Sequence, residues 1–119
     1  MERPVSKAWA TPEGTPLGAI AQGLGKSASA GNTSGFLLLS GPQEAYSARL
    51  ALIASAQKTL DLQYYAIHAD ASSGKLLRAV RAAASRGVRV RILLDDLHST
   101  GRNAVVMRMA FEPNVEMRM

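Results

Sequence analysis

Residues 60–96 constrain the fold of this chain most, because they contain a strand pattern, a helix pattern and a second strand pattern in succession. Every second side chain in residues 60–66 is apolar, which predicts a half-buried strand. In residues 74–86 apolar side chains recur at helical spacing, and Gly87 suits the left-handed position just past a helix end. Residues 88–94 alternate and then become continuously apolar, which predicts a strand buried on both faces toward its carboxyl end.

The segment before this unit predicts a further helix. Residues 36–39 form a short apolar run, which we interpret as an edge strand or as a plug against the core. Ser40 and Gln43 have capping-box spacing at the start of the helix. The buried stripe expected for it is Tyr46, Leu50 and Ile53.

The segment after the unit completes the predicted sheet. Ser99 or Thr100 is expected to cap a third helix over residues 102–109, and residues 115–119 alternate as a strand. Two strands joined by a helix form a parallel, right-handed unit. The predicted fold class is therefore α/β, with a β-α-β-α-β, mostly parallel sheet flanked by helices.

The amino-terminal residues differ in composition from the rest. Residues 1–35 are rich in Gly, Pro, Ser, Thr and Ala and have no sustained periodicity, so we expect a disordered tail before an α/β domain at residues 36–119. We find no signal peptide and no apolar run approaching the roughly 18 residues of a membrane-spanning helix. A cytoplasmic location, or a peripheral one at the inner membrane, is expected.

Both histidines follow predicted strands. His68 and Asp70 come after the first strand, and Asp95, Asp96 and His98 come after the second. Ligands of open α/β sheets bind beyond the carboxyl ends of the strands, so one hypothesis is a metal or acid/base site built from these side chains. The alternative is that Asp, His and Ser occur there for turn and capping reasons.

Several blocks of the sequence together resemble the first domain of phospholipase D-like proteins, in particular the bacterial cardiolipin synthase branch. The blocks are residues 48–53, residues 60–65, Asp70 with Gly74, and residues 86–96. The resemblance runs from about residue 35 to the last residue. Ala66, His68 and residues 97–100 depart from the family pattern, so details of substrate choice are not carried over.

The resemblance implies a phosphodiester-exchanging enzyme in which one histidine attacks phosphorus and a second protonates the leaving alcohol, with no metal and no other cofactor. Those residues belong to a His-x-Lys-x4-Asp motif, and neither histidine of this chain is followed by the required lysine. No catalytic residue is therefore assigned. The residues expected at the edge of the active site are Gln63, Tyr65, His68, Asp70, Asp95, Asp96 and His98.

The positive charge is concentrated in one half of the chain. Residues 75–119 hold nine Lys or Arg and four Asp or Glu, which accounts for the whole formal charge of +5. Such a surface faces phosphate groups or is simply solvated. The residues that we assign to a phosphate-facing surface are Lys75, Arg78, Arg81 and Arg86.

Two functions remain open at this stage. The first is an amino-terminal piece of a cardiolipin synthase-like domain, inactive alone and either derived from a catalytic protein or completed by a catalytic partner chain. The second is a basic module, without enzymatic activity, that binds anionic phosphate surfaces of membranes or nucleic acid. The resemblance implies anionic phospholipid as the partner, and nucleic acid is not expected because the aromatic residues are few and clustered. Self-association through an open sheet edge near residues 115–119 is also expected.

Overall fold

The computed structural model describes residues 5–11, 13–27, 34–95 and 104–119. The chain divides into two compact units, Met1–Ser34 and Gly35–Met119. The predicted site residues all fall in the second unit. No helix among the described residues is long and apolar enough to cross a membrane.

The first unit contains helix α1, Pro16–Ser27. The composition of residues 1–35 did not predict this helix. The side chain of Thr15 caps the helix, since its Oγ1 accepts a hydrogen bond of 3.0 Å from the amide of Gly18. The helix buries little, because Ile20 and Leu24 remain 60% and 68% exposed. Glycines within the segment lower its helix propensity, which is why composition alone favoured a tail.

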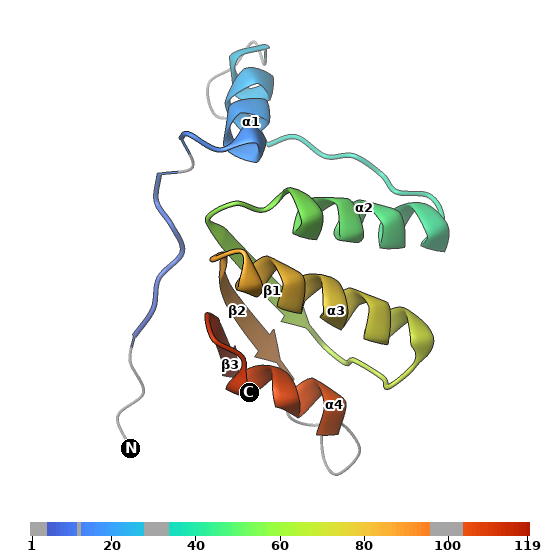
Figure 1. Cartoon of the computed structure of the whole chain (residues 1–119). Coiled ribbons are helices and arrows are strands. Elements are labelled where there is room, and N and C mark those ends of the chain that lie inside the picture. The colour runs from blue at the N-terminus through green and yellow to red at the C-terminus, as the bar shows by residue number, and fades with distance from the viewer. Residues whose placement is uncertain (1–4, 12, 28–33, 96–103) are drawn as a thin grey trace. The chain divides into compact units, whose positions relative to one another are not determined.

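The second unit is built on a three-stranded sheet (Figure 1). The strands are β1, Thr59–Tyr64, β2, Arg89–Leu94, and β3, Val115–Arg118. Their order is β1-β2-β3, and both pairs are parallel. Leu62, Ile92 and Met117 lie side by side in register. The predicted α/β fold with a parallel sheet and flanking helices is confirmed.

The helices of this unit are α2, Pro42–Ser55, α3, Ala71–Ser85, and α4, Ala104–Met107, which continues as the 3₁₀ helix η1, Arg108–Phe111. Helix α3 begins three residues earlier than predicted, because Asp70 caps it. Its end is as predicted: Gly87 follows with a φ of 93°, a conformation that glycine adopts without strain.

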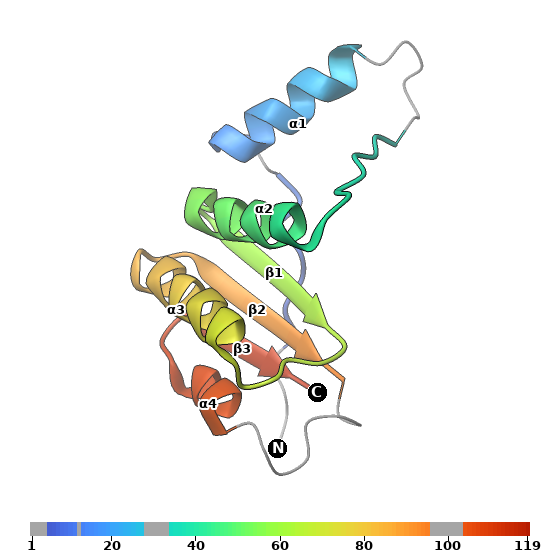
Figure 2. The same cartoon turned by 90° about the vertical axis from the view of Figure 1, so that its right-hand side faces the viewer.

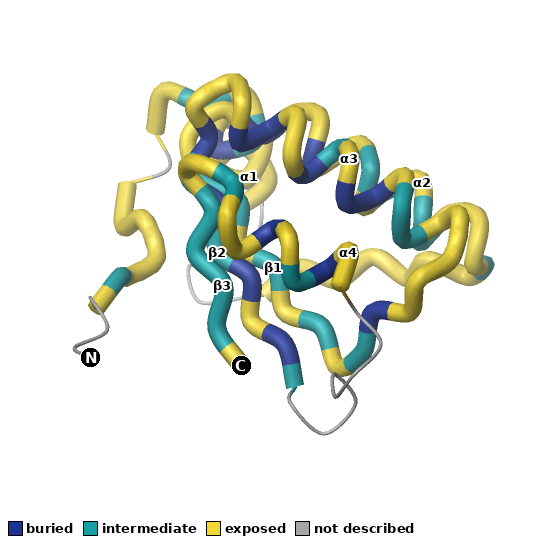
Figure 3. Tube along the Cα trace, turned by 60° about the horizontal axis from the view of Figure 1, so that its bottom comes forward, coloured by how far each residue is buried: buried dark blue, intermediate teal, exposed yellow. Residues whose placement is uncertain are grey.

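The hydrophobic core lies between the sheet and these helices (Figure 3). Val80 of α3, Val90 of β2 and Val106 of α4 are each at most 1% exposed. Ile53 of α2 is buried, whereas Tyr46 and Leu50 are only partly buried against the core. The stripe predicted for α2 is therefore confirmed, with Ile53 as its fully buried member.

Two predictions at the start of the second unit are wrong. Phe36, Leu37 and Leu38 are 96%, 85% and 87% exposed and belong to no strand, so this run is neither an edge strand nor a plug. A short apolar run becomes a strand only where an edge pairs with it, and no described strand does so. The capping pair is also shifted by one residue: Gly41 is the N-cap, and Glu44 accepts hydrogen bonds from the amide and hydroxyl of Ser40.

The carboxyl end of β2 also differs from expectation. Ile92 and Leu94 are buried, but Leu93 between them is 49% exposed. The predicted burial of both faces is therefore wrong. Helices α2, α3 and α4 lie on one face of the sheet (Figure 2). The core of the described residues in 35–119 lies on that face, so the side chains of β2 that alternate away from it stay more accessible.

Candidate functional site

The carboxyl ends of β1 and β2 meet at one edge of the sheet, as the arrowheads in Figure 2 show. A hollow of about 750 Å³ opens there. It is lined by Gln63, Tyr64, Tyr65, Leu93, Leu94, Asp95 and Met119. The site thus lies where ligands of parallel α/β sheets ordinarily bind.

Three of the predicted site residues come together around this hollow. Gln63 is exposed on β1, and Tyr65, 66% exposed, follows directly after that strand. Asp95 comes directly after β2, and its amide donates a 3.3 Å hydrogen bond to the carbonyl of Tyr64. This bond extends the ladder by one residue and places Asp95 opposite Tyr65. Their role in catalysis stays a prediction.

The loop between β1 and α3 places the other two described site residues away from the hollow. Asp70 caps α3 by accepting a 2.8 Å hydrogen bond from the amide of Ser73. This hydrogen bond lowers the pKa of the Asp70 carboxyl below its ordinary value, and nearby His68 contributes less. His68 is exposed, and its carbonyl accepts from the amide of Asp70. The capping alternative considered for Asp70 therefore holds.

Asp96 and His98 lie outside the described residues. Among those that are described, no three His, Cys, Asp or Glu side chains are grouped so that they could hold a metal ion. The hypothesis of a metal or acid/base cluster stays a prediction, because two of its five side chains are not described; Asp70, a third, caps α3.

Two of the four residues assigned to a phosphate-facing surface have partners within the chain. The guanidinium of Arg86 donates to the carbonyls of Ile53, Ala54 and Ala56, at 3.2, 3.3 and 3.4 Å. It thereby satisfies carbonyls at the end of α2 that lack partners within the helix. Arg81 forms an ion pair of 2.8 Å with Glu112. Lys75 and Arg78 are exposed on α3.

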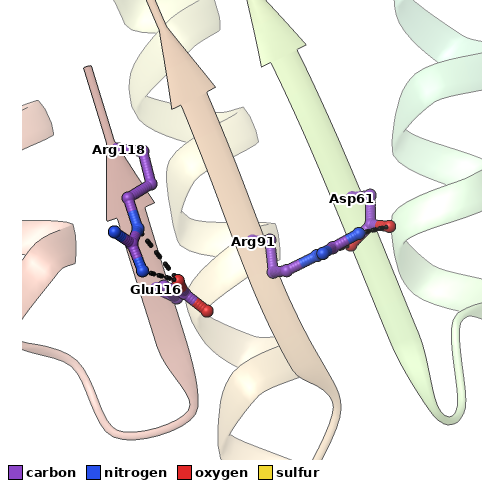
Figure 4. Close-up of polar contacts among 4 residues, drawn as sticks. All are labelled: Asp61, Arg91, Glu116 and Arg118. Atoms are coloured by element: carbon purple, nitrogen blue, oxygen red, sulfur yellow. Dashed lines mark hydrogen bonds and ion pairs between the residues drawn. The ribbon is translucent and has the colours of Figure 1, made fainter. Parts of the chain in front are cut away.

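The sheet face that points away from the core carries ion pairs (Figure 4). Asp61 and Arg91, neighbours across β1 and β2, form a two-pronged pair with Nε to Oδ1 at 2.8 Å. Arg118 pairs with Glu116 on the same strand. The hydrogen bond from Arg91 lowers the pKa of Asp61 below its ordinary value, and Asp61 raises that of Arg91.

Two further features of the site were missed by sequence reasoning. The guanidinium of Arg49, on α2, lies 5.7 Å from the ring centre of Tyr64, a cation–π contact between distant segments. Leu93 lines the hollow. The alternation of Arg89, Arg91 and Leu93 is the signal that could have predicted this, because all three lie on one face of β2.

Residues 50–118 match the family described as cardiolipin synthase, PLD-like domain. The chain therefore belongs to the phospholipase D-like superfamily. Within it the match assigns the chain to the cardiolipin synthase branch, as the sequence resemblance implied.

Curated relatives agree with this assignment. The chain is 42% identical to cardiolipin synthase C of Escherichia coli (strain K12) over 76 residues, which cover 64% of this chain and 16% of that protein. It is 35% identical over 108 residues to an uncharacterized protein of Helicobacter pylori (strain ATCC 700392 / 26695), covering 90% of this chain and 21% of that protein. The chain thus spans about a fifth or less of the length of these relatives.

A solved structure has the same fold. NucT from Helicobacter pylori superposes with a TM-score of 0.56 at 23% identity. The match covers 69% of this chain and 50% of that one. At this identity the likeness concerns the fold alone.

Proposed function

We propose that this chain forms the substrate-side edge of a phosphodiester-exchanging active site of the cardiolipin synthase type. The observation that carries the proposal is the position of Gln63, Tyr65 and Asp95 around one hollow, at the carboxyl ends of β1 and β2, in a chain of this family. The substrate class is a phosphodiester of a phospholipid.

The chemistry of the three side chains suits this role. The amide of Gln63 and the hydroxyl of Tyr65 can donate hydrogen bonds to the non-bridging oxygens of a phosphodiester. The carboxylate of Asp95 can accept one from a hydroxyl of the substrate or from a histidine brought to the hollow. These groups orient a substrate, but none can form a phosphohistidine intermediate.

The proposal assigns the nucleophile and the phosphate-holding lysine to a His-x-Lys-x4-Asp segment that is not within these 119 residues. Such a segment would be supplied by a partner chain or by a longer polypeptide. We expect the chain by itself to be inactive, because neither His68 nor His98 is followed by the lysine of this motif.

Turnover of bis(4-nitrophenyl) phosphate and of phosphatidylglycerol by the purified chain tests this part of the proposal. We expect no turnover above the blank. Activity that disappears in His98→Ala, or in the matched variant His68→Ala, would show that the chain carries its own nucleophile and would overturn the assignment.

The alternative function, a basic module that binds anionic phosphate surfaces, receives less support. Arg86 is engaged with carbonyls, and Arg81 is paired with Glu112. Any binding to anionic vesicles through Lys75 and Arg78 should be weak and lost with salt, since screened surface charges carry it. Self-association of the chain stays a prediction.

A further inference from the structure

Leu93 is an apolar side chain on a sheet face where the other side chains of β2 are charged. The side chains of β2 that point away from the core are Arg89, Arg91 and Leu93, of which the first two are charged. Leu93 nevertheless leaves 49% of its surface accessible. Its neighbours in register are Gln63 on β1 and Arg118 on β3, so a lone apolar side chain interrupts a polar row.

Among the described residues, apolar side chains line the hollow together with Leu93. Tyr65 and Met119 line the hollow with it and are 66% and 51% exposed. Gln63 and Asp95 line the same hollow with polar groups. The hollow is therefore an open depression with both apolar and polar lining.

This combination favours an amphiphilic occupant. A purely polar diester would leave the apolar surfaces of Leu93 and Tyr65 exposed to water. An apolar helix of a partner would cover the exposed amide of Gln63 without offering it a hydrogen bond, which costs free energy. A lipid that has a polar diester joined to acyl chains meets both requirements at once. Arg118, beside Leu93 in register, is paired with Glu116 and so adds little net charge to the hollow.

We propose that Leu93 and Tyr65 determine specificity: they contact the acyl-bearing glycerol of the substrate and make the site prefer lipid phosphodiesters over soluble ones. The inference rests on the proposed function, because it places the diester against Gln63 and Asp95. It goes further by assigning the discrimination between lipid and soluble substrates to two named side chains of this chain.

Binding of two probes to the full chain, followed through backbone amide shifts, tests the inference. One probe is dihexanoyl phosphatidylglycerol below its micelle concentration, and the other is glycerophosphoglycerol, the same diester without acyl chains. We expect the lipid to bind about tenfold tighter, with shifts centred on Leu93 and Gln63, since burying even a few methylenes is worth this much.

Matched variants identify the residues responsible. Leu93→Ser should reduce the preference to about twofold or less, whereas Leu52→Ser, on α2 and similarly exposed at 53%, should leave it unchanged. Tyr65→Ser lies outside the strands and provides a second variant if Leu93→Ser does not fold.

Failure of the inference alone can be distinguished from failure of the proposed function. Equal binding of both probes, or a preference that persists in Leu93→Ser and Tyr65→Ser, overturns the inference and leaves the proposed function standing. Loss of the preference in Leu52→Ser to the same extent overturns it too, because it indicates nonspecific adsorption. If neither probe binds, the proposed substrate class and the inference fail together.

Discussion

Side chains alternate between the two faces of the sheet, and the two faces differ in how far their side chains are buried. On β2, Val90, Ile92 and Leu94 pack under the helices and are at most 5% exposed. On the other face, Arg91 pairs with Asp61, and Leu93 remains half exposed beside the hollow. The helix-covered face stabilises the domain through apolar burial, and the other face is available for contacts with ligands or further chain.

This difference separates residues that maintain the fold from residues that can serve function. A parallel sheet is ordinarily covered on both faces. Among the described residues of the second unit, the core occupies one face, and the accessible one carries ion pairs instead of an apolar layer. Substitutions on the two faces should therefore have very different consequences for stability.

Ile92→Ala should give the largest effect, because it removes a side chain that is 3% exposed and leaves a cavity. We expect a loss of about 2–5 kcal/mol in the free energy of unfolding. Leu93→Ala, one residue on, should change it by about 0.5 kcal/mol or less. Urea denaturation followed by circular dichroism measures both. Equal losses would show that both faces of β2 are buried in solution.

Arg86→Ala should be the most destabilising change among the basic residues of α3 and its end. It leaves the carbonyls of Ile53 and Ala56 without their guanidinium donor, and we expect a loss of about 1–2 kcal/mol. Arg78→Ala, exposed on the same helix, is the matched control and should cost about 0.5 kcal/mol or less. If the two variants lose the same stability, the hydrogen bonds of Arg86 to these carbonyls do not stabilise the fold.

Asp70→Ala should give a smaller loss of stability, because it removes only the side-chain cap of α3. The contribution of this cap depends on pH. The hydrogen bond from Ser73 lowers the pKa of Asp70 in the folded chain, so its stabilisation is present above the ordinary aspartate pKa. It is lost as the pH falls through the lowered pKa. Asp70→Asn keeps a capping side chain that does not titrate, so it should retain stability at neutral pH and flatten this acid dependence. Thermal melts of the parent chain and both variants across the acid range measure this. If the melting temperature depends on pH in the same way in all three, the cap does not contribute to stability.

Asp61→Asn should have the smallest effect, since its ion pair with Arg91 is on the accessible face and 39% of the Asp61 side chain is exposed. We expect less than about 1 kcal/mol, decreasing with added salt. The pKa of Asp61 is lowered by Arg91, so this contribution too is present above the ordinary aspartate pKa and lost below the lowered one. A large, salt-independent loss would mean that this face is covered in solution.

Much of the fold follows from periodicity. The strands, α3 and its end at Gly87 are predictable because apolar spacing and a glycine after a helical pattern can be recognised in the local sequence. The positive φ of Gly87 agrees with this. The exposure of Leu93 is not, because it depends on whether a second layer covers the sheet. Pairing of the run that contains Phe36 likewise depends on a distant edge.

The candidate site was predictable in part. Gln63, Tyr65 and Asp95 could be placed together because the carboxyl ends of parallel strands share an edge. Asp70 was assigned to that edge, but it caps α3, since a carboxylate one residue before a helix accepts from the first-turn amides. The contact of Arg49 with Tyr64 joins α2 to β1 and leaves no signal in either segment alone.

The most direct test of the central claim is cardiolipin formation by a chimera of cardiolipin synthase C of Escherichia coli in which residues 50–118 of this chain replace the matching segment. We predict that the chimera is active and that Gln63→Ala and Asp95→Asn each lower turnover at least about tenfold, or 1.4 kcal/mol of barrier. Gln57→Ala, an exposed glutamine just before β1 at the opposite edge of the sheet, should leave turnover unchanged. An active chimera in which Gln63→Ala and Asp95→Asn behave like Gln57→Ala would contradict the assignment of this edge to the active site.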